Sequence, residues 1–316
     1  MIYTVTLNPS VDYYLQVEEL LIGEVNRAEK NYKYPGGKGI NVSRVLKRLD
    51  TDSIASGFIG GFTGRYIDRC LKNEGIYTDF IIIEEDTRIN VKISGSERTD
   101  ENGKSRVNSE TEINGQGPYI KSEKIDELFE KLNRLTDEDF LVLSGNVQRS
   151  IPRDIYSKIQ KRCSKTNAKI IVDTTGEALT STLENRPFLI KPNLYELSEI
   201  FKSKIDSKEE VINYGKKLID LGVENVIVSM GGEGAILVSK MGAFYSIAPK
   251  GLVKNSVGSG DSLIGGFLAN YSKSQNILES FKWGIAAGSA TAFSQDLCKI
   301  EDVKRLLKKV NIKKLV

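Results

Sequence analysis

The 316-residue sequence contains no histidine, and this absence narrows the chemistry open to the protein. Catalytic triads that need an imidazole, and metal sites built on paired histidines, are both excluded. A general base must therefore be a carboxylate, a lysine, a tyrosine or a cysteine. Cysteine is scarce as well: Cys70, Cys163 and Cys298 lie far apart, with no CxxC pair. Such spacing argues against a disulfide framework and against a thiolate zinc site, and it suits a reducing cytoplasm.

Long apolar runs and a strong excess of charge are also missing. No segment approaches the roughly 18 consecutive apolar residues of a membrane span, and no basic leader precedes the strand-like residues 2–7. The net charge is +3, with 40% hydrophobic and 28% charged residues, an ordinary globular balance. We therefore expect a cytoplasmic protein with neither a nucleic-acid nor a membrane partner. The basic C-terminal residues are interpreted as a solvated helix face and tail.

Short apolar strands alternate with amphipathic helices through most of the chain. This alternation predicts βαβ units around a mainly parallel sheet, whose ligands gather at the carboxyl ends of the strands. A helix is expected at residues 63–73, and strands are expected at residues 2–7, 53–58, 80–83, 140–143, 169–172, 188–190 and 225–228.

Two segments, at about 12–35 and 88–108, break this rhythm with alternating polar and apolar residues. Turn signals stand at Gly23 and at Asn102-Gly103, and the second lies between strand-like residues 89–93 and 105–107. Four short strands inserted into an α/β body predict a small β-sheet flap beside the ligand site. A pair of ordinary surface hairpins fits the same pattern.

The strongest chemical signal is the glycine-rich turn NSVGSGDS at residues 255–262, followed by apolar residues at helical spacing. Backbone N–H groups at such a turn converge on one point and form an anion site. Asp261, in the first helical turn, would face the anion, and there it could accept a proton from an attacking hydroxyl. Alternatively, Asp261 only initiates the helix and complements its dipole.

A second glycine turn, GGKGIN at residues 36–41, also opens an amphipathic helix. Glycine permits close backbone approach, Lys38 adds positive charge, and Asn41 offers both a donor and an acceptor. A plain loop-to-helix junction with an exposed lysine is the alternative. The spacing is not that of a Walker A loop, and no GxGxxG follows the first strand.

Two further segments fit a nucleotide site. Residues 226–234 read as a strand running into a glycine turn, which could equally be a plain hairpin. In KPNLYE, Asn193 and Glu196 place an amide and a carboxylate one helical turn apart, a spacing that suits Mg²⁺. The alternative is a helix start at Asn193 with Glu196 in a capping box.

Taken together, these motifs resemble the ribokinase-like (PfkB) carbohydrate kinases over essentially the whole chain. TLNP with Asp12, GGKGIN, KPNxxE and GSGD occur here in that family's order. Within the family, TRINVK (87–92) and TEINGQGP (111–118) are most similar to the 1-phosphofructokinase branch, with tagatose-6-phosphate kinases as near relatives. The resemblance implies one domain over residues 1–316, a three-layer α/β/α fold with a mainly parallel sheet, and a small β lid.

The resemblance also assigns roles to residues. Asp261 matches the catalytic base, and the backbone of Gly258, Ser259 and Gly260 matches the anion hole. The sugar-site candidates are Asp12, Gly37, Lys38 and Asn41, with Lys38 and the lid residues Arg27 and Arg88 facing the substrate's phosphate. The metal and nucleotide candidates are Asn193 and Glu196 for Mg²⁺, and Lys191, Ser229, Gly231, Gly234, Gly258 and Gly260 for ATP.

Two positions depart from the family pattern. Asn255 stands where many members carry an aspartate that helps to bind a monovalent cation, so potassium activation is not assumed. Asn146 stands where a serine is more usual, which leaves its role open.

The activity implied is ATP-dependent phosphorylation of fructose 1-phosphate, with tagatose 6-phosphate or fructose 6-phosphate as alternative substrates. A non-catalytic sugar or nucleotide sensor is a rival of another class, and the complete GSGD turn argues against it. A nicotinamide-dependent dehydrogenase is disfavoured because its fingerprint is missing. Because exposed lid strands invite pairing, a homodimer through the lid is expected.

Overall fold

A ten-stranded sheet forms the centre of the part of the chain that our computed structural model describes, residues 1–95 and 110–316. Its strands are β1 (Ile2–Thr6), β4 (Ile54–Gly60), β5 (Tyr77–Ile83), β8 (Phe140–Ser144), β9 (Lys169–Asp173), β10 (Leu189–Ile190), β11 (Asn225–Ser229), β12 (Ala235–Ser239), β13 (Gly242–Ser246) and β14 (Lys313–Lys314). They lie in the order β14-β13-β12-β11-β10-β9-β8-β1-β4-β5. The seven strands from β11 to β5 in this order are parallel, whereas β12, β13 and β14 are antiparallel.

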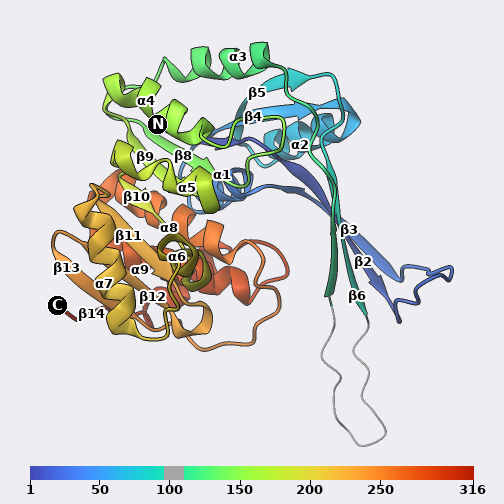
Figure 1. The fold of residues 1–316 in the computed structure, drawn as a ribbon. Coiled ribbons are helices and arrows are strands. Elements are labelled where there is room, and N and C mark those ends of the chain that lie inside the picture. The colour runs from blue at the N-terminus through green and yellow to red at the C-terminus, as the bar shows by residue number, and fades with distance from the viewer. Residues whose placement is uncertain (96–109) are drawn as a thin grey trace, which may run out of the picture.

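Helices cover both faces of this sheet and make three layers (Figure 1). Alternation along the strands divides the core, since Leu141 and Leu143 of β8 pack into one cluster and Phe140 and Val142 into the other. The first cluster includes residues of α3 (Ser122–Leu132), α4 (Ile155–Cys163), α5 (Gly176–Thr180), α6 (Leu194–Phe201) and α7 (Lys208–Asp220). The second includes residues of α1 (Lys38–Arg48), α8 (Ser259–Ser274), α9 (Ile277–Ala292) and α10 (Ile300–Leu307). The predicted three-layer α/β/α fold is confirmed.

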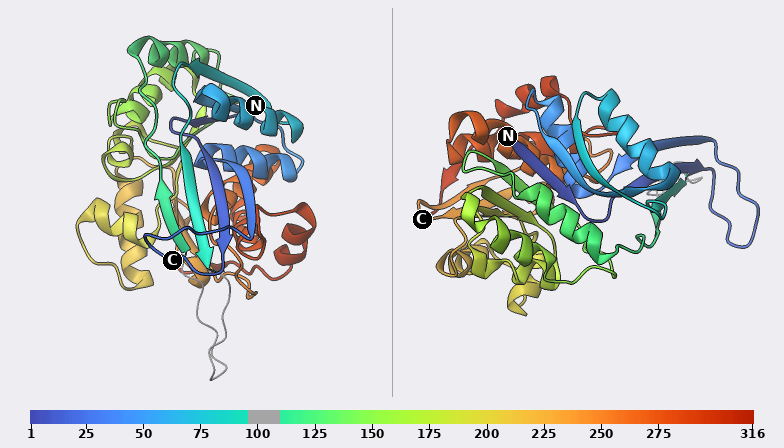
Figure 2. Two further views of the ribbon diagram at one scale, coloured as in Figure 1. Left: turned by 90° about the vertical axis from the view of Figure 1, so that its right-hand side faces the viewer. Right: turned by 90° about the horizontal axis from the view of Figure 1, so that it is seen from above.

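A separate four-stranded sheet projects from this body (Figures 1 and 2). It contains β2 (Ser10–Val17), β3 (Lys30–Gly36), β6 (Ile89–Gly95) and β7 (Glu110–Asn114), in the order β3-β2-β6-β7. The chain passes from β1 into β2 through residues 7–9, so the small sheet is joined directly to the carboxyl edge of the large one. The expected turn at Asn102-Gly103 and strand at residues 105–107 lie outside the described residues.

The predicted strands of the large sheet and the predicted helix are present, whereas β7 of the small sheet and the antiparallel end of the large sheet are additions. Each predicted parallel strand agrees with an observed one to within a few residues, and α2 (Gly61–Asn73) includes the helix expected at 63–73. Strands β11 and β12 form a hairpin through residues 230–234, so the plain-hairpin interpretation of that glycine turn is correct locally. Within the described ranges, no helix is long and apolar enough to cross a membrane.

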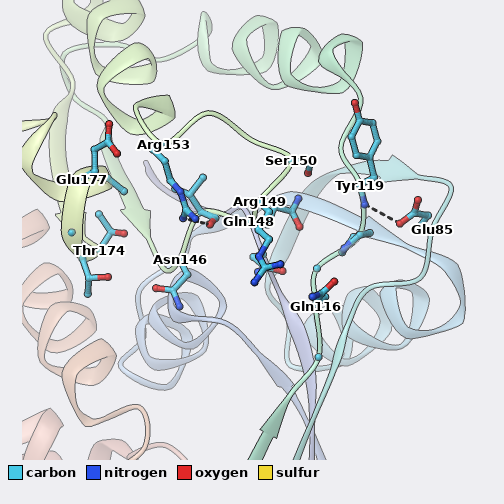
Figure 3. A pocket seen from close by; sticks show the side chains of 18 residues that line it. Glu85, Gln116, Tyr119, Asn146, Gln148, Arg149, Ser150, Arg153, Thr174 and Glu177 are labelled. Carbon is cyan, nitrogen blue, oxygen red and sulfur yellow. Dashed lines mark hydrogen bonds between the residues drawn. The ribbon is translucent and has the colours of Figure 1, made fainter.

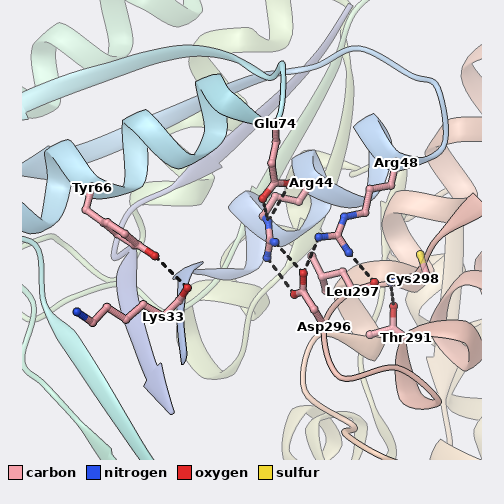
Figure 4. Close-up of polar contacts among 9 residues, drawn as sticks. All are labelled: Lys33, Arg44, Arg48, Tyr66, Glu74, Thr291, Asp296, Leu297 and Cys298. Carbon is pink, nitrogen blue, oxygen red and sulfur yellow. Dashed lines mark hydrogen bonds and ion pairs between the residues drawn. The ribbon is translucent and has the colours of Figure 1, made fainter. Parts of the chain in front are cut away.

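Buried ion pairs fasten α1 to the segment that follows α9 (Figure 4). Arg44, whose side chain is 4% exposed, donates from Nη1 and Nη2 to the two carboxylate oxygens of Asp296, at 3.2 and 2.9 Å. Its Nε donates to Glu74, which follows α2. Arg48 also pairs with Asp296 and donates to the carbonyl oxygen of Leu297. The arginines of α1 thus fix the position of the residue that follows α2 and of the segment that follows α9.

We expect the Asp296→Ala substitution to destabilise the protein by about 3 kcal/mol, because it removes the main partner of a buried guanidinium. Urea denaturation followed by circular dichroism measures the change. Lys158→Ala is the matched control, since its pair with Asp154 is about half exposed on both sides; it should cost no more than about 1 kcal/mol. Equal losses in the two variants would contradict the structural role given to Asp296.

Candidate active site

Most of the predicted site residues meet in one cavity of about 430 Å³ between the carboxyl edge of the large sheet and the small sheet. Those lining it are Asp12, Gly37, Lys38, Asn41, Arg88, Lys191, Asn193, Glu196, Ser229, Gly258, Gly260 and Asp261, together with Asn146. Ser259, Gly231 and Gly234 belong to adjoining turns and do not line it. Arg27 does not line it either and is exposed between β2 and β3. This chain therefore does not bring Arg27 to its own cavity.

The glycine turn has the geometry that its sequence predicts. Gly258 has φ +77°, a left-handed conformation that favours glycine, and α8 begins at Ser259. A side chain at position 258 would also meet Leu297, since its Cβ would lie 2.8 Å from that residue's Cδ2. Gly258 and Gly260 both line the cavity, whereas the N–H of Ser259, the first residue of α8, donates to the Ser256 carbonyl oxygen at 3.2 Å.

Asp261 lies in the first turn of α8 and is 7% exposed. Asn41 of α1 donates from Nδ2 to Asp261 Oδ2 at 2.8 Å, so the two glycine turns of the sequence meet at this carboxylate. Burial, and then the nearby Asp173 carboxylate, raise the pKa of Asp261 to about 6, although Lys38, Asn41 and Lys191 act to lower it. A carboxylate with such a pKa accepts a proton more readily than an exposed aspartate.

Asp173, at the carboxyl end of β9, is a site residue that the sequence reasoning missed. Its side chain is 1% exposed and lies between Lys38 Nζ, at 3.2 Å, and Lys191 Nζ, at 3.3 Å. Burial acts to raise the pKa of this carboxyl, but Lys191 and Lys38 hold it below its usual value. The same arrangement raises the pKa of Lys38 despite burial, through Asp173 and Asp261. The sequence does contain a signal that could have identified Asp173, because it is an acidic residue directly after the apolar strand residues KIIV.

Asn193 and Glu196 form a capping box at the start of α6. Asn193 Oδ1 accepts from the Glu196 N–H at 2.8 Å, and Glu196 Oε2 accepts from the Asn193 N–H at 2.8 Å. The capping alternative therefore describes the local geometry, and both side chains still line the cavity. No group of three or more acidic, cysteine or histidine side chains in the described ranges is arranged to hold a metal. A buried oxygen, Asp173 Oδ2, lacks a hydrogen-bond partner among these residues.

The small sheet supplies the opposite wall. Asp12 Oδ1 accepts from Ser10 Oγ at 2.7 Å and from Asn90 Nδ2 at 3.0 Å. Gly36 packs against this carboxylate so closely that a Cβ there would lie 2.5 Å from it. Arg88 lines the cavity, but its guanidinium donates to two carbonyl oxygens, those of Asn8 at 3.1 Å and Gly115 at 3.4 Å. Arg88 thus ties the small sheet to the segment after β1.

The turn after β11 lies beside the cavity. Gly231 (φ +57°) and Gly234 (φ +93°) have left-handed conformations, and Gly234 packs against the carbonyl oxygen of Ser246 too closely for a side chain. A Cβ at Gly231 would meet nothing within 4 Å, so this backbone borders open space. Ser229, at the end of β11, lines the cavity itself.

Two curated relatives match the whole length of this chain. A 1-phosphofructokinase from Bacillus subtilis is 48% identical over 315 residues, covering 100% of each chain. A D-tagatose-1-phosphate kinase from Bacillus licheniformis is 36% identical over 313 residues, covering 99% of each. Both matches cover the segments that form the large sheet, the small sheet and the cavity in this chain.

Comparison with solved structures agrees with the sequence matches. Phosphofructokinase-2 from Escherichia coli, solved in complex with substrates and products, superposes with a TM-score of 0.90 at 25% identity over 98% of each chain. The model of the pfkB family of carbohydrate kinases matches residues 6–302, a range that includes the Asn41–Asp261 contact and the lysine-flanked Asp173. The chain belongs to the pfkB family of carbohydrate kinases.

Proposed function

We propose that the protein is an ATP-dependent 1-phosphofructokinase. It transfers the γ-phosphoryl group of ATP to the 6-hydroxyl of fructose 1-phosphate and gives fructose 1,6-bisphosphate and ADP. The observation that carries this proposal is the buried Asp261 carboxylate, held by Asn41 at the glycine turn that opens α8. The substrate is proposed from the full-length similarity to the Bacillus subtilis 1-phosphofructokinase.

Asp261 is the proposed general base. The sugar hydroxyl attacks the γ-phosphorus, the bond from that phosphorus to the bridging oxygen breaks, and the hydroxyl proton passes to Asp261. Phosphoryl transfer has a loose transition state, so the proton is needed only late and the positioning of the reactants dominates the rate. The N–H groups at Gly258 and Gly260, which line the cavity, are assigned to the charge of the transferring group. The Ser259 N–H donates to the Ser256 carbonyl oxygen at 3.2 Å, so Ser259 is assigned to the support of the turn.

Lys38 and Lys191 are assigned to the part of the site where the phosphoryl group is transferred, close to Asp261. Their ammonium groups lie on either side of Asp173, and Lys38 is also close enough to Asp261 for each to shift the other's pKa. This position favours the transferring phosphoryl group as the ligand of Lys38, rather than the phosphate already on the sugar. Asp12, Gly37 and Asn41 are assigned to the sugar hydroxyls.

The residues of the site that are not yet assigned fit ATP and Mg²⁺. The unpartnered Asp173 Oδ2, together with Asn193 and Glu196, offers hard oxygen ligands, directly or through water. Bound Mg²⁺ would neutralise charge on the nucleotide phosphates. Ser229, Gly231, Gly234 and Lys191 are proposed on the nucleotide side, where the backbone at Gly231 borders open space.

Tagatose 1-phosphate is the second candidate substrate, because the Bacillus licheniformis relative is a D-tagatose-1-phosphate kinase at 36% identity. The deciding experiment is a coupled ADP-release assay with MgATP on fructose 1-phosphate, tagatose 1-phosphate, tagatose 6-phosphate and fructose 6-phosphate. The highest kcat/KM is expected with fructose 1-phosphate. Preference for a 6-phosphate would contradict the assignment of the sugar end.

In the same assay, Asp261→Asn should lower kcat by about 10²–10⁴-fold, because an amide cannot accept the hydroxyl proton. The fold should persist, since the amide can still bond to the Asn41 side chain. Asp302→Asn, an acid in the first turn of α10, is the matched control and should keep its activity. Turnover of Asp261→Asn within threefold of the wild type would remove Asp261 from the role of base.

The pH dependence follows from the raised pKa of Asp261. Because only the ionised carboxylate accepts a proton, kcat/KM should rise with pH and level off above about 6. The substrate's own phosphate titrates in this range, so the informative quantity is a difference between enzymes. Asp173→Asn removes the negative charge that helps to raise the pKa of Asp261. The acid limb of the kcat/KM profile should therefore move to lower pH in this variant. Asp139→Asn is the control: Asp139 is also buried but pairs with the N-terminal ammonium group of Met1, and its substitution should leave the acid limb unchanged.

The small sheet is the proposed dimer surface. Every residue of the edge strand β7 is exposed, and Ile113 on it is 58% exposed. Pairing two such sheets would cover these apolar side chains and strand edges. We expect Ile113→Lys to weaken the dimer at least about tenfold, measured by light scattering over a dilution series. Ile82→Lys, an exposed isoleucine of β5 on the large sheet, is the control and should not change the mass.

A further inference from the structure

A larger cavity of about 920 Å³ adjoins the first (Figure 3). Its walls come mainly from residues 115–119, 146–150 and 174–178, and it shares Asn8 and Asn146 with the smaller cavity. We call the region around these two shared residues the neck between the cavities. A ligand that spans the smaller cavity from Asp261 to Asn8 would reach this neck.

The neck contains buried polar atoms that the described residues leave without hydrogen-bond partners. Gln148 is 5% exposed, and neither its Nε2 nor its Oε1 is paired; Asn8 Oδ1 and Arg88 Nε are unpaired as well. The two amides lie side by side against Gly117, where a Cβ would be 2.2 Å from Gln148 Oε1 and 2.4 Å from Asn8 Oδ1. A buried polar group without a partner destabilises the fold, so a ligand that bonds to this cluster gains affinity from satisfying it.

The positively charged side chains around the neck favour the binding of an anion. Arg149 and Arg153 come from the same loop as Gln148, and Arg88 approaches from the smaller cavity. In Figure 3, Arg149, Gln148 and Asn146 lie centrally, whereas Glu85 and Glu177 lie toward opposite margins. No hydrogen bond occupies Arg149 within the described ranges, and the Arg153 guanidinium donates to the Val147 carbonyl oxygen at 3.1 Å.

Hydrogen bonds to backbone carbonyl oxygens hold the start of the loop that carries Gln148. Tyr156 of α4, which is fully buried, donates its hydroxyl hydrogen toward the carbonyl oxygens of Ser144 and Gly145, each at 3.0 Å. Thr174 Oγ1 donates to the same Gly145 carbonyl at 2.9 Å. These bonds fix the start of the loop, and the Gln148 carbonyl oxygen accepts from the Ile151 N–H at 3.1 Å, so the backbone on both sides of the Gln148 side chain is held.

We propose that Gln148 is a specificity-determining residue, whose Nε2 donates to the phosphate ester already carried by the sugar, while Arg149 raises the positive potential around it. The inference rests on the proposed function and deepens it, because it places the non-reacting phosphate in the neck, at the end of the sugar opposite Asp261. Gln148 acts in recognition and not in the chemical step.

The test compares Gln148→Leu with Gln148→Glu in the coupled ADP-release assay. Gln148→Leu keeps most of the side-chain volume and removes the donor; it should raise KM for fructose 1-phosphate about tenfold or more and leave KM for MgATP within twofold. Gln148→Glu places a carboxylate against the phosphate and should lose more kcat/KM. With unphosphorylated fructose, the kcat/KM of both variants should stay within threefold of the wild type.

Gln160→Leu is the matched control. Gln160 of α4 is also buried, at 2% exposure, with both amide atoms unpaired among the described residues, but it does not line either cavity. It should leave every KM unchanged. A KM for fructose 1-phosphate within twofold of wild type in Gln148→Leu would overturn the inference while the proposed function stands. A parallel rise with fructose would also overturn it, since that indicates a structural role. A wild type inactive on all sugar phosphates would overturn the proposed function and this inference with it.

Discussion

The buried carboxylate of Asp173 between two lysines is the interaction on which the rest of the site depends. At 1% exposure, an unpaired charge would be too costly, and Lys38 and Lys191 offset that cost from two different segments. The same negative charge acts on Asp261 and helps to raise its pKa. A structural ion pair at the end of β9 thus also tunes the proposed base, since the two carboxylates share one desolvated cluster.

Helix α1 connects this electrostatic cluster to the scaffold. Asn41, Arg44 and Arg48 are spaced so that they share one side of the helix. Asn41 bonds to Asp261, while the two arginines hold Asp296 and the Leu297 carbonyl. Leu297 in turn packs where a side chain at position 258 would stand. The glycine turn at Gly258 and the proposed base are therefore both positioned through α1, and the ion pairs of the buried Arg44 offset its desolvation cost.

Local patterns in the sequence predicted the parallel strands, the two glycine turns and the position of Asp261, because each depends on short-range periodicity or on turn chemistry. Asp173 was missed because a single acidic residue after a strand becomes informative only when the lysines of other segments surround it. The pairing of β12, β13 and β14 was also missed, since antiparallel addition at a sheet end is set by tertiary packing. Arg27 was placed at the sugar on resemblance alone, and in this structure it is exposed between β2 and β3 and does not line the cavity.

In the part of the chain that the structure describes, most of the buried side-chain polar atoms without hydrogen-bond partners belong to residues that line one of the two cavities, and this placement bears on function. Those lining a cavity are Thr6 Oγ1, Asn8 Oδ1, Arg88 Nε, Asn90 Oδ1, Gln148 Oε1 and Nε2, and Asp173 Oδ2. A folded core rarely tolerates such groups, so their concentration at one edge of the sheet indicates positions kept for a ligand at the expense of stability. Gln160 is unpaired away from both cavities, which shows that a single unpaired amide is weak evidence. The case for Gln148 therefore depends on its neighbours, because Asn8, Arg88 and Gly117 give its amide a shared space that a phosphate ester can fill.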